Sequence, residues 1–418
     1  MDQVRESFIV FFLSGVTPAF IFTLFKEETP MKHARLRMFA LVISIMMLLS
    51  MLAGCAGESN SAGGNADTRE ITDMLGNKVT IPTNIERVAV LTSPQVQIMY
   101  VVGAQDKLCA MTASQYRYKL FEKFYPRQAE IPAPRKQAAD MNVEELLEAD
   151  PQFCIGSEMD MDLVKQTTEI TTINIATDDD PAKVFETRKQ EVAMFGEIFN
   201  AQDRAQKYAD YLDNTLAKIA KATESVEGKE LSVYLGFNAD HLTTYGGDTF
   251  MQYQIEAAGL KNAAEGITSA TGKEGGLVTI SPEQILEWDP DMIVIDSGSL
   301  EELKADPAWK DLKAVKSGNV HILPVGAFIW NRPSTESAVL LPMWLSVTAY
   351  PELYPDTSAA AEVKGYWKEI FGFELSDEDV DSILHPAPMG GQGGGNGQGG
   401  GNGQGNGQGG GQNKGGQN

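Results

Sequence analysis

The sequence predicts an α/β protein in which two lobes with parallel central sheets are joined by one long α-helix. Short continuous apolar runs alternate with helical segments, which is typical of parallel strands covered on both faces. One helix–turn–strand pattern occurs twice, once in each half of the chain. Between the halves, residues 203–223 contain no proline or glycine and place apolar side chains along one helical face. A helix of that length spans roughly 30 Å, enough to connect two lobes.

The order of the expected elements is the same in both halves. In the first half we expect strands at 87–92, 108–112, 152–155 and 172–176, with helices at 96–103 and 142–149. In the second half we expect strands at 231–235, 292–295 and 320–323, with helices at 249–258, 281–288 and 337–350. The lobes are therefore expected to cover residues 69–200 and 226–388, joined by a helix over 201–225.

The repeated unit lies at residues 141–155 and 280–294. Asn142 and Ser281 are suitable N-caps, and Glu144 and Glu283 follow in the first helical turn, where the helix dipole favours negative charge. In both copies an Asp-Pro pair ends the helix and an apolar strand follows. The two halves are therefore two copies of one α/β plan.

The chain begins with an export signal. Residues 31–54 combine a basic start, an apolar run at 38–52 and small residues directly before Cys55. This Leu-Ala-Gly-Cys ending resembles the bacterial lipobox, which implies that Cys55 becomes the lipid-modified first residue of an extracytoplasmic protein. Residues 55–68 form a flexible tether. Residues 1–30 are interpreted as a mis-called start, with an extra hydrophobic segment as the alternative.

The other terminus and the overall charge exclude several classes of protein. Residues 389–418 are almost entirely Gly, Gln and Asn, a composition that predicts a disordered tail. A net charge of −23 excludes a nucleic-acid binder, because the phosphate backbone would be repelled. Cys109 and Cys154 lie in apolar runs and are interpreted as buried and unpaired, with a single bridge between them left open.

Neither an enzyme nor a bare metal site is expected. The sequence has no GxSxG, P-loop, GxGxxG or HExxH motif. Only four histidines occur, of which His241 alone lies near a predicted ligand loop. Because a transition-metal site gathers several His, Cys or carboxylate ligands, a metal is expected to arrive already chelated. A cell-surface lipoprotein hydrolase and an adhesin are the remote alternatives.

The chain resembles the class III periplasmic binding proteins, which bind siderophores, haem and cobalamin. The resemblance covers residues 68–384 and lies in a set of ordered segments: 71–82, 87–91, the two repeated units, Trp330 to Ser334, 340–345 and 350–355. It implies two Rossmann-like lobes with a ligand cleft between them and no cofactor. It also implies a monomer that delivers an iron-siderophore, haem or corrinoid to an ABC permease dimer with its ATPase. In this family an acidic residue on each lobe docks on permease arginines, and the matching residues are Glu144 and Glu283.

Ligands of open α/β sheets bind beyond the carboxyl ends of the strands. The loops expected at those ends carry aromatic and guanidinium groups that suit a flat or carboxylate-bearing chelate. The candidate ligand residues are Ser93, Gln95, Tyr116, Arg117, Tyr118, Phe237, Tyr245, Trp330 and Arg332, with Trp330 and Tyr116 the strongest. For each of them, a role in packing its own lobe is the alternative. A molybdate or tungstate oxyanion, held by Arg332 and backbone N–H groups, is the rival ligand.

Overall fold

The computed structural model describes residues 67–137, 140–175, 180–268 and 276–387. The predicted signal over 31–54, the lipidation site Cys55, the segment 1–30, residues 55–66 of the tether and the tail lie outside these residues. Among the helices of the described ranges, none has the combination of length and apolar character that a membrane span requires.

Each lobe contains a four-stranded parallel sheet, which confirms the predicted fold class. In the N-terminal lobe the strand order is β4-β3-β7-β8, and in the C-terminal lobe it is β11-β9-β13-β14. The bounds of these strands are β3 Val88–Val90, β4 Leu108–Met111, β7 Phe153–Gly156, β8 Thr171–Asn174, β9 Ser232–Gly236, β11 Lys261–Asn262, β13 Met292–Ile295 and β14 Val320–Ile322. The central strands are buried along their whole length, as continuous apolar runs require.

Three antiparallel pairs complete the strand set of the described chain. The segment 71–82, part of the family resemblance, lies in a hairpin of β1 (Thr68–Thr72) and β2 (Lys78–Pro82). The other pairs are β5 (Arg135–Gln137) with β6 (Asp140–Met141), and β10 (Thr243–Tyr245) with β12 (Leu277–Thr279).

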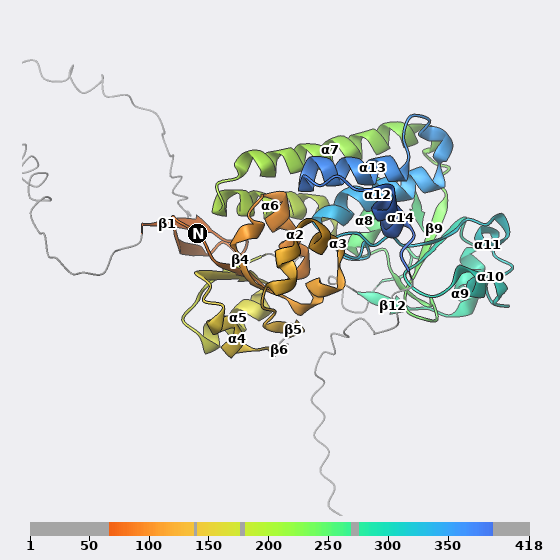
Figure 1. Cartoon of the computed structure of the whole chain (residues 1–418). Coiled ribbons are helices and arrows are strands. Elements are labelled where there is room, and N and C mark those ends of the chain that lie inside the picture. Colours follow the sequence, from red (N-terminus) through yellow and green to blue (C-terminus); the bar gives the residue numbers. More distant parts are fainter. Residues whose placement is uncertain (1–66, 138–139, 176–179, 269–275, 388–418) are drawn as a thin grey trace, which may run out of the picture. The chain divides into compact units, whose positions relative to one another are not determined.

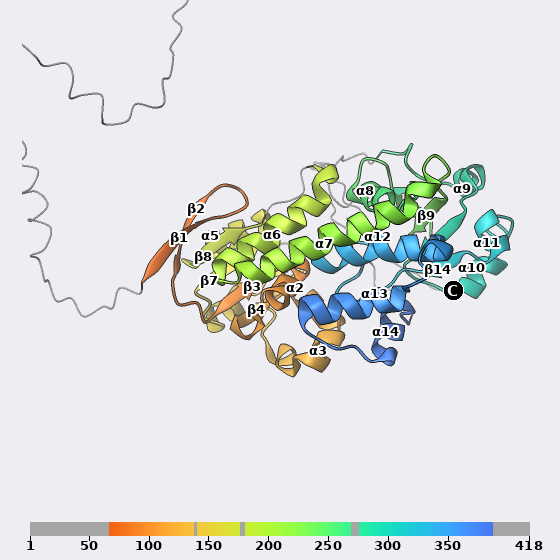
Figure 2. The same ribbon diagram turned by 90° about the horizontal axis from the view of Figure 1, so that it is seen from above.

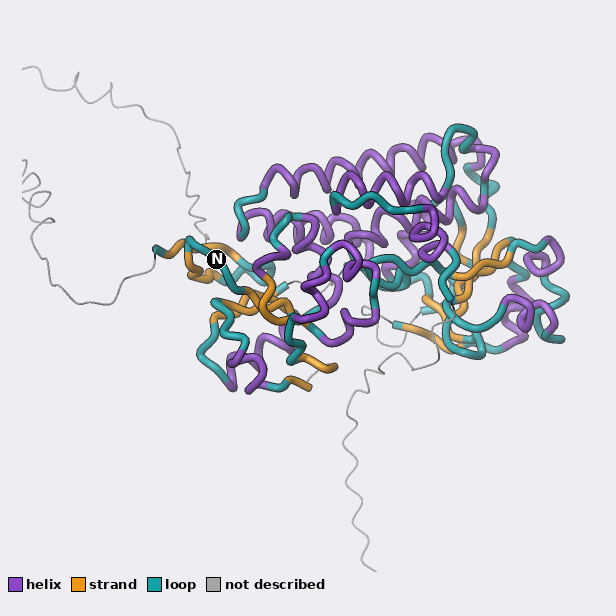
Figure 3. The backbone as a smooth tube through the Cα atoms, viewed as in Figure 1, coloured by secondary structure: helices purple, strands orange, loops and turns teal. Residues whose placement is uncertain are grey.

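Helices surround both sheets and connect the lobes (Figures 1 and 3). Their bounds are α2 Ser93–Val101, α3 Leu120–Phe124, α4 Val143–Glu148, α5 Glu158–Thr167, α6 Val184–Ile198, α7 Gln202–Thr223, α8 Phe250–Ala257, α9 Pro282–Trp288, α10 Leu300–Ala305, α11 Lys313–Ser317, α12 Thr335–Ala349, α13 Ala359–Tyr366 and α14 Asp377–Leu384.

The long helix predicted between the halves is α7, which begins one residue after and ends two residues before the expected bounds of 201–225. It packs against α6 and α12, and α12 packs in turn against α13 and α8. Figures 1 and 2 show α7 running from one lobe toward the other with α12 and α13 beside it. The lobes are therefore joined by a layer of several helices, where the sequence predicted one.

Aromatic side chains add a further contact between the N-terminal lobe and the C-terminal helices. The ring of Phe121, on α3, lies 5.4 Å from the ring of Trp367 and 5.1 Å from that of Phe371. Close by, Lys123 pairs with Asp379 of α14 at 2.6 Å. One apolar core continues through both lobes as a result.

The repeated unit has the same structure in both lobes. Asn142 accepts a hydrogen bond from the backbone N–H of Glu145, and Ser281 accepts one from that of Gln284, so both predicted N-caps are confirmed. Asp150 and Asp289, the acids of the two Asp-Pro pairs, both have positive φ angles, 46° and 42°. The left-handed residue ends each helix and turns the chain into the central strand, β7 or β13.

Several helices of the first half differ from the prediction, among them α2 and α6, and α3 and α5 were also not predicted. Helix α2 begins at Ser93, three residues earlier than expected, because Pro94 fits the first turn of a helix. The 15-residue helix α6 was not predicted. Its buried face carries the ion pair Arg188–Glu191 at 3.1 Å, and these charged residues interrupt the apolar pattern that indicates a buried helix.

The two described cysteines are free and buried, which confirms the unpaired interpretation. Burial raises the pKa of the Cys109 thiol to about 11 and that of Cys154 to about 12. Both are therefore protonated, unreactive core residues at neutral pH.

Candidate ligand-binding site

Three predicted ligand residues of the C-terminal lobe form one cluster. Phe237 directly follows β9 and Tyr245 ends β10, and their rings lie 5.2 Å apart, edge to face. The guanidinium of Arg332 lies 5.9 Å from the centre of the Tyr245 ring and donates a hydrogen bond to its hydroxyl. Tyr245 also donates to the backbone oxygen of Asn331 at 2.9 Å, which fixes the ring against the loop that carries Arg332.

Tyr118 brings the N-terminal lobe to the same loop. It follows the short 3-10 helix η3 (Ala113–Arg117), and its ring lies 5.0 Å from that of Phe328. Burial raises the pKa of Tyr118 to about 12, although a hydrogen bond from the backbone of Ile329 and the nearby charges of Arg117 and Arg332 act in the opposite direction. The two lobes therefore meet where Tyr118 contacts residues 328–329.

Positive charge is concentrated around Tyr118. Arg332 is half-buried, and loss of water around its guanidinium lowers its pKa. Its hydrogen-bond acceptors, the Tyr245 hydroxyl and the Asn331 backbone oxygen, are uncharged. Among the described residues, neither Arg332 nor the exposed Arg117 has a carboxylate within ion-pair distance. In a chain of net charge −23, two unpaired guanidinium groups next to one tyrosine favour an anionic ligand.

Ser93 and Gln95 were expected in an open loop, but they lie in the first turn of α2 and are almost completely buried. Ser93 bonds the Ser114 hydroxyl at 2.7 Å, and Gln95 donates to Glu191 at 2.9 Å. Their polar groups thus support the loop before Tyr118 and the interior of α6. Both residues are buried because α2 begins earlier than expected and includes them in its first turn.

Trp330 and Tyr116, the two strongest candidates for ligand contact, are also less exposed than we expected. Trp330 is completely buried, and its indole helps to lower the pKa of Glu336, so it lies beneath the loop surface. Tyr116 is half-buried and donates its hydroxyl proton to the backbone oxygen of Ile131. In this structure both side chains pack within the protein, and a contact of either one with the ligand stays a prediction.

Glu336, which the sequence prediction missed, holds the ligand loop from below. Its carboxylate accepts hydrogen bonds from the backbone N–H of Ala327 and from the Trp367 indole, each at 2.8 Å. A Cβ on Gly326 would lie 2.2 Å from this carboxylate, so only glycine fits there. Burial raises the pKa of Glu336 to about 7, against the lowering effect of these donors. A glutamate at the start of the otherwise apolar helix α12 was the available signal.

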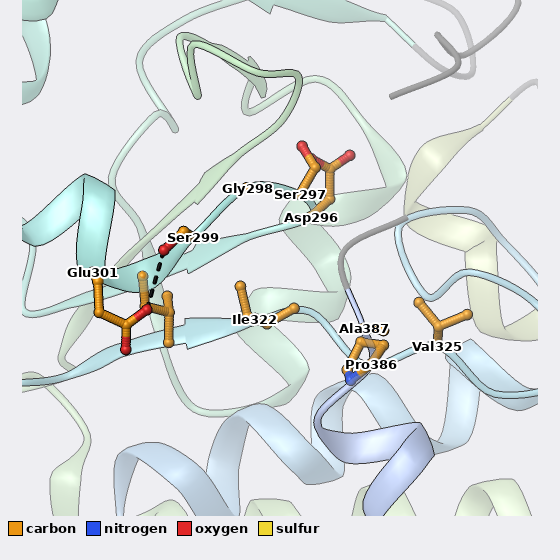
Figure 4. A pocket seen from close by; sticks show the side chains of 10 residues that line it. Asp296, Ser297, Gly298, Ser299, Glu301, Ile322, Val325, Pro386 and Ala387 are labelled. Carbon is orange, nitrogen blue, oxygen red and sulfur yellow. Dashed lines mark hydrogen bonds between the residues drawn. The ribbon is translucent and has the colours of Figure 1, made fainter. Parts of the chain in front are cut away.

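A hollow of about 260 Å³ lies beyond the carboxyl ends of β13 and β14 (Figure 4). Asp296, Ser297 and Ser299 line it from the segment after β13, Ile322 from β14, and Pro386 and Ala387 from the C-terminal segment. Burial raises the pKa of Asp296. The neighbouring His241 is buried, and its pKa is lowered by burial more than Asp296 raises it.

A second hollow, of about 600 Å³, lies in the N-terminal lobe at the start of β4 and the end of α4. Arg87, Arg127, Glu130 and Glu148 are among its lining residues. Each of these two hollows is lined by a single lobe, so neither is the predicted cleft. Among the described residues, no group of three or more His, Cys, Asp or Glu side chains is placed to hold a metal ion.

The predicted docking residues occupy equivalent positions. Glu144 and Glu283 are exposed in the first turns of α4 and α9, the helices that precede β7 and β13. Hydrogen bonds from its own backbone and from Ser281 lower the pKa of Glu283. Figures 1 and 2 place the two lobes that carry these helices at opposite ends of the helical layer.

A comparison with known protein families shows to which family this chain belongs. The family model described as "Periplasmic binding protein" matches residues 88–325, which include both parallel sheets. The chain belongs to the periplasmic binding protein family. This finding confirms the resemblance inferred from the sequence, and the family consists of solute receptors of transport systems, in keeping with the expectation of a non-enzyme.

Curated relatives of this periplasmic binding protein have different ligands in their names. It is 25% identical to the molybdate-binding protein MolA of Haemophilus influenzae, over 78% of this chain and 97% of that protein. It is 24% identical to the petrobactin-binding protein YclQ of Bacillus subtilis, over 71% of this chain and 93% of that protein. An iron(3+)-hydroxamate-binding protein of Bacillus subtilis is 23% identical, over 69% of this chain and 89% of that protein.

Solved structures support the same fold. A periplasmic solute-binding protein from Veillonella parvula superimposes with a TM-score of 0.67 at 22% identity, covering 76% of this chain and 97% of that one. The molybdate-bound MolA of Haemophilus influenzae superimposes with a TM-score of 0.62 at 23% identity, covering 74% of this chain and 99% of that one.

Proposed function

We propose that this protein is the extracytoplasmic receptor of an ABC importer, and that it binds an anionic metal chelate between its lobes. The observation that carries the proposal is the pair of guanidinium groups, Arg117 and Arg332, that flank Tyr118 without a carboxylate partner in the described chain. Siderophores, ferric citrate and haem all bear carboxylate or other anionic oxygens that guanidinium groups bind through paired hydrogen bonds.

The aromatic rings around these charges favour a chelate over a small ion. Tyr118 and Phe328 are in contact at the junction of the lobes, and separating their rings would offer two faces to a flat ligand. Most of the curated relatives that name a ligand name a siderophore or an iron(3+) complex.

An oxyanion such as molybdate is the second candidate, and one specific observation favours it. MolA, named for molybdate, matches this chain over more of its length than the iron-complex relatives do. Arg332 with backbone N–H groups would hold such an ion, as in other anion sites.

Titration of the mature protein decides between these ligands. Trp330 and Trp367 are buried against Glu336, under the ligand loop, so tryptophan fluorescence should report a change at the loop. We expect saturable quenching by one of the following: a ferric siderophore, ferric citrate, haem, cobalamin or molybdate. Saturation by molybdate alone would select the oxyanion, and no saturation by any of the five would contradict the proposed class of ligand.

Delivery to the permease is proposed to use Glu144 and Glu283. Both are exposed and begin the same helix in the two repeated units, so each can meet one copy of a partner with two-fold symmetry. Replacing both by alanine should leave ligand affinity unchanged and abolish uptake by cells. Uptake at the normal rate by this double variant would contradict the assignment.

Anchoring through Cys55 is proposed from the export signal. Relatives in Bacillus subtilis are named as lipoproteins. In cells fed a labelled fatty acid, the wild-type protein should carry the label and sediment with membranes. The Cys55→Ala variant should carry no label, and labelling of that variant would exclude Cys55 as the anchor.

A further inference from the structure

Large apolar side chains are exposed at four positions of the described chain. They are Leu75, Leu147, Met159 and Leu286, with exposed fractions of 44%, 52%, 62% and 48%. A single exposed leucine is ordinary on a protein surface. Two of these four, however, occupy the same position in the two repeated units.

Leu147 and Leu286 each lie three residues after the docking glutamate and three residues before the left-handed aspartate. Their neighbours Leu146 and Ile285 are buried, at 0% and 2% exposure, and fill the apolar contact of each helix with its own lobe. The exposed leucines are therefore additional to the side chains that the core of each lobe requires.

Helical spacing places each leucine between two carboxylates. Residues three and four apart lie on one helix face, so Glu144, Leu147 and Glu148 form one surface on α4. Glu283, Leu286 and Glu287 form the same surface on α9. We call each of these an acidic leucine face.

The carboxylates of both faces have no cationic partner among the described residues, and all four glutamates are exposed. The intervening residue Glu145, by contrast, is used within its lobe: it accepts from the backbone N–H of Ala133 and lies 3.6 Å from Lys136. On α4, Glu145 is therefore bonded within its own lobe. The side chains of Glu144, Leu147 and Glu148 remain available for a partner.

We propose that the two acidic leucine faces are the docking surface for the permease, and that each leucine enters an apolar socket rimmed by basic side chains. The proposal rests on the proposed function and adds to it the apolar contact that the two glutamates alone would lack. An apolar centre inside a charged rim is the usual anatomy of a protein interface. Its duplication on two lobes fits a partner composed of two equivalent halves, and its negative charge fits basic rims.

The test compares matched leucine and control variants in binding to the permease. Ligand-loaded protein, wild type or variant, is titrated onto its permease–ATPase complex in lipid nanodiscs, and ligand affinity is measured separately by tryptophan fluorescence. Leu147→Ala and Leu286→Ala should each weaken docking about five- to tenfold, because each removes three carbons of a side chain of which about half is exposed in the free protein and would be buried by the permease. The double variant should weaken docking by about the product of the two single factors, and its affinity for the ligand should not change. The control pair Leu75→Ala with Met159→Ala, whose side chains are exposed to a similar extent but lie outside the repeats, should change docking less than about twofold.

The outcomes separate this inference from the proposed function. If Glu144→Ala with Glu283→Ala abolishes docking while the double leucine variant docks like wild type, the leucine contact is wrong and the receptor function stands. If the glutamate pair also docks and supports uptake normally, the docking assignment itself fails. If only one of the two leucine variants weakened docking, a docking surface with two equivalent halves would be contradicted. Equal loss of binding to empty nanodiscs would show that the leucines contact lipid instead.

Discussion

The two lobes are alike where the repeated units lie and different where the ligand is expected. In both lobes an N-capped helix with an exposed glutamate ends at a left-handed aspartate and leads into the central strand. At the carboxyl ends of the strands the lobes share little. The N-terminal loop is held by hydroxyl groups, with Ser114 bonded to Ser93 and Thr112 at 2.7 and 3.0 Å, whereas the C-terminal loop is held by the buried carboxyl group of Glu336.

This difference fits the two functions proposed for the repeated units and for the loops. A partner that presents two equivalent halves keeps the matching surfaces of a duplicated fold equivalent. A ligand without that symmetry makes different contacts with the two lobes, so the loops that face it are free to diverge.

The largest expected difference lies in how much the two loop anchors, Glu336 and Ser114, contribute to the stability of the protein. Glu336→Ala removes the acceptor of the Ala327 N–H and the Trp367 indole, and should lower the free energy of unfolding by about 3–4 kcal/mol. Ser114→Ala in the N-terminal loop should cost about 1 kcal/mol, because it loses neutral hydrogen bonds only. Urea denaturation measures both, and equal losses would refute the proposed difference between the anchors.

The carboxyl anchor Glu336 should also make stability depend on pH. In the folded protein the pKa of Glu336 is about 7, above the ordinary value of 4.5, so the folded state holds this proton more tightly than the unfolded state. Stability from this group is therefore present at low pH and is lost as pH rises from about 4.5 to 7, by an amount on the order of 3 kcal/mol. Glu336→Gln should flatten this part of the profile relative to wild type. An unchanged slope in the variant would show that other groups cause it.

The two guanidinium groups should contribute unequally to ligand affinity. Arg332 is half-buried, so Arg332→Ala should weaken binding of an anionic ligand by about 10- to 100-fold, the value of a charge-assisted hydrogen bond. Arg117 is exposed, and Arg117→Ala should weaken binding by no more than about fivefold. Fluorescence titration compares them, with Arg127→Ala as an exposed control on the same lobe. A larger effect at Arg117 would place the ligand on the N-terminal side.

The smallest expected change in stability comes from Asp150 and Asp289, the left-handed residues that end the two repeated helices. An L-residue in the left-handed region costs about 1 kcal/mol, so Asp150→Gly should stabilise the protein by about 0.5–1 kcal/mol. Asp289→Gly should give no gain, because the Asp289 carboxylate accepts a 2.8 Å hydrogen bond from the Lys313 backbone N–H, and that bond would be lost. Thermal unfolding followed by circular dichroism resolves the difference, and equal shifts of both midpoints would show that this bond contributes nothing.

Prediction from the sequence was accurate for elements governed by local patterns. The strand Met292–Ile295 and the helix Gln202–Thr223 were located almost to the residue, because an apolar run and a helical stripe are local signals. It failed at α6, whose buried face includes Arg188 and Glu191. A buried ion pair is acceptable only when its partners are held in place, and the linear pattern does not record that arrangement.

Sequence patterns alone were enough to predict the two-lobed α/β plan, the repeated helix–turn–strand units and the position of the long connecting helix. These depend on periodicity, caps and Asp-Pro breaks, which act over a few residues. Only the tertiary structure decided which aromatic and charged residues of the loops face outward. Trp330, expected at the ligand, is completely buried, whereas Arg332, two residues later, meets Tyr245 and has no carboxylate partner in the described chain. The physical reason is that exposure and pairing in a loop depend on contacts between segments far apart in the chain, such as Tyr118 with Phe328 and Glu336 with Trp367.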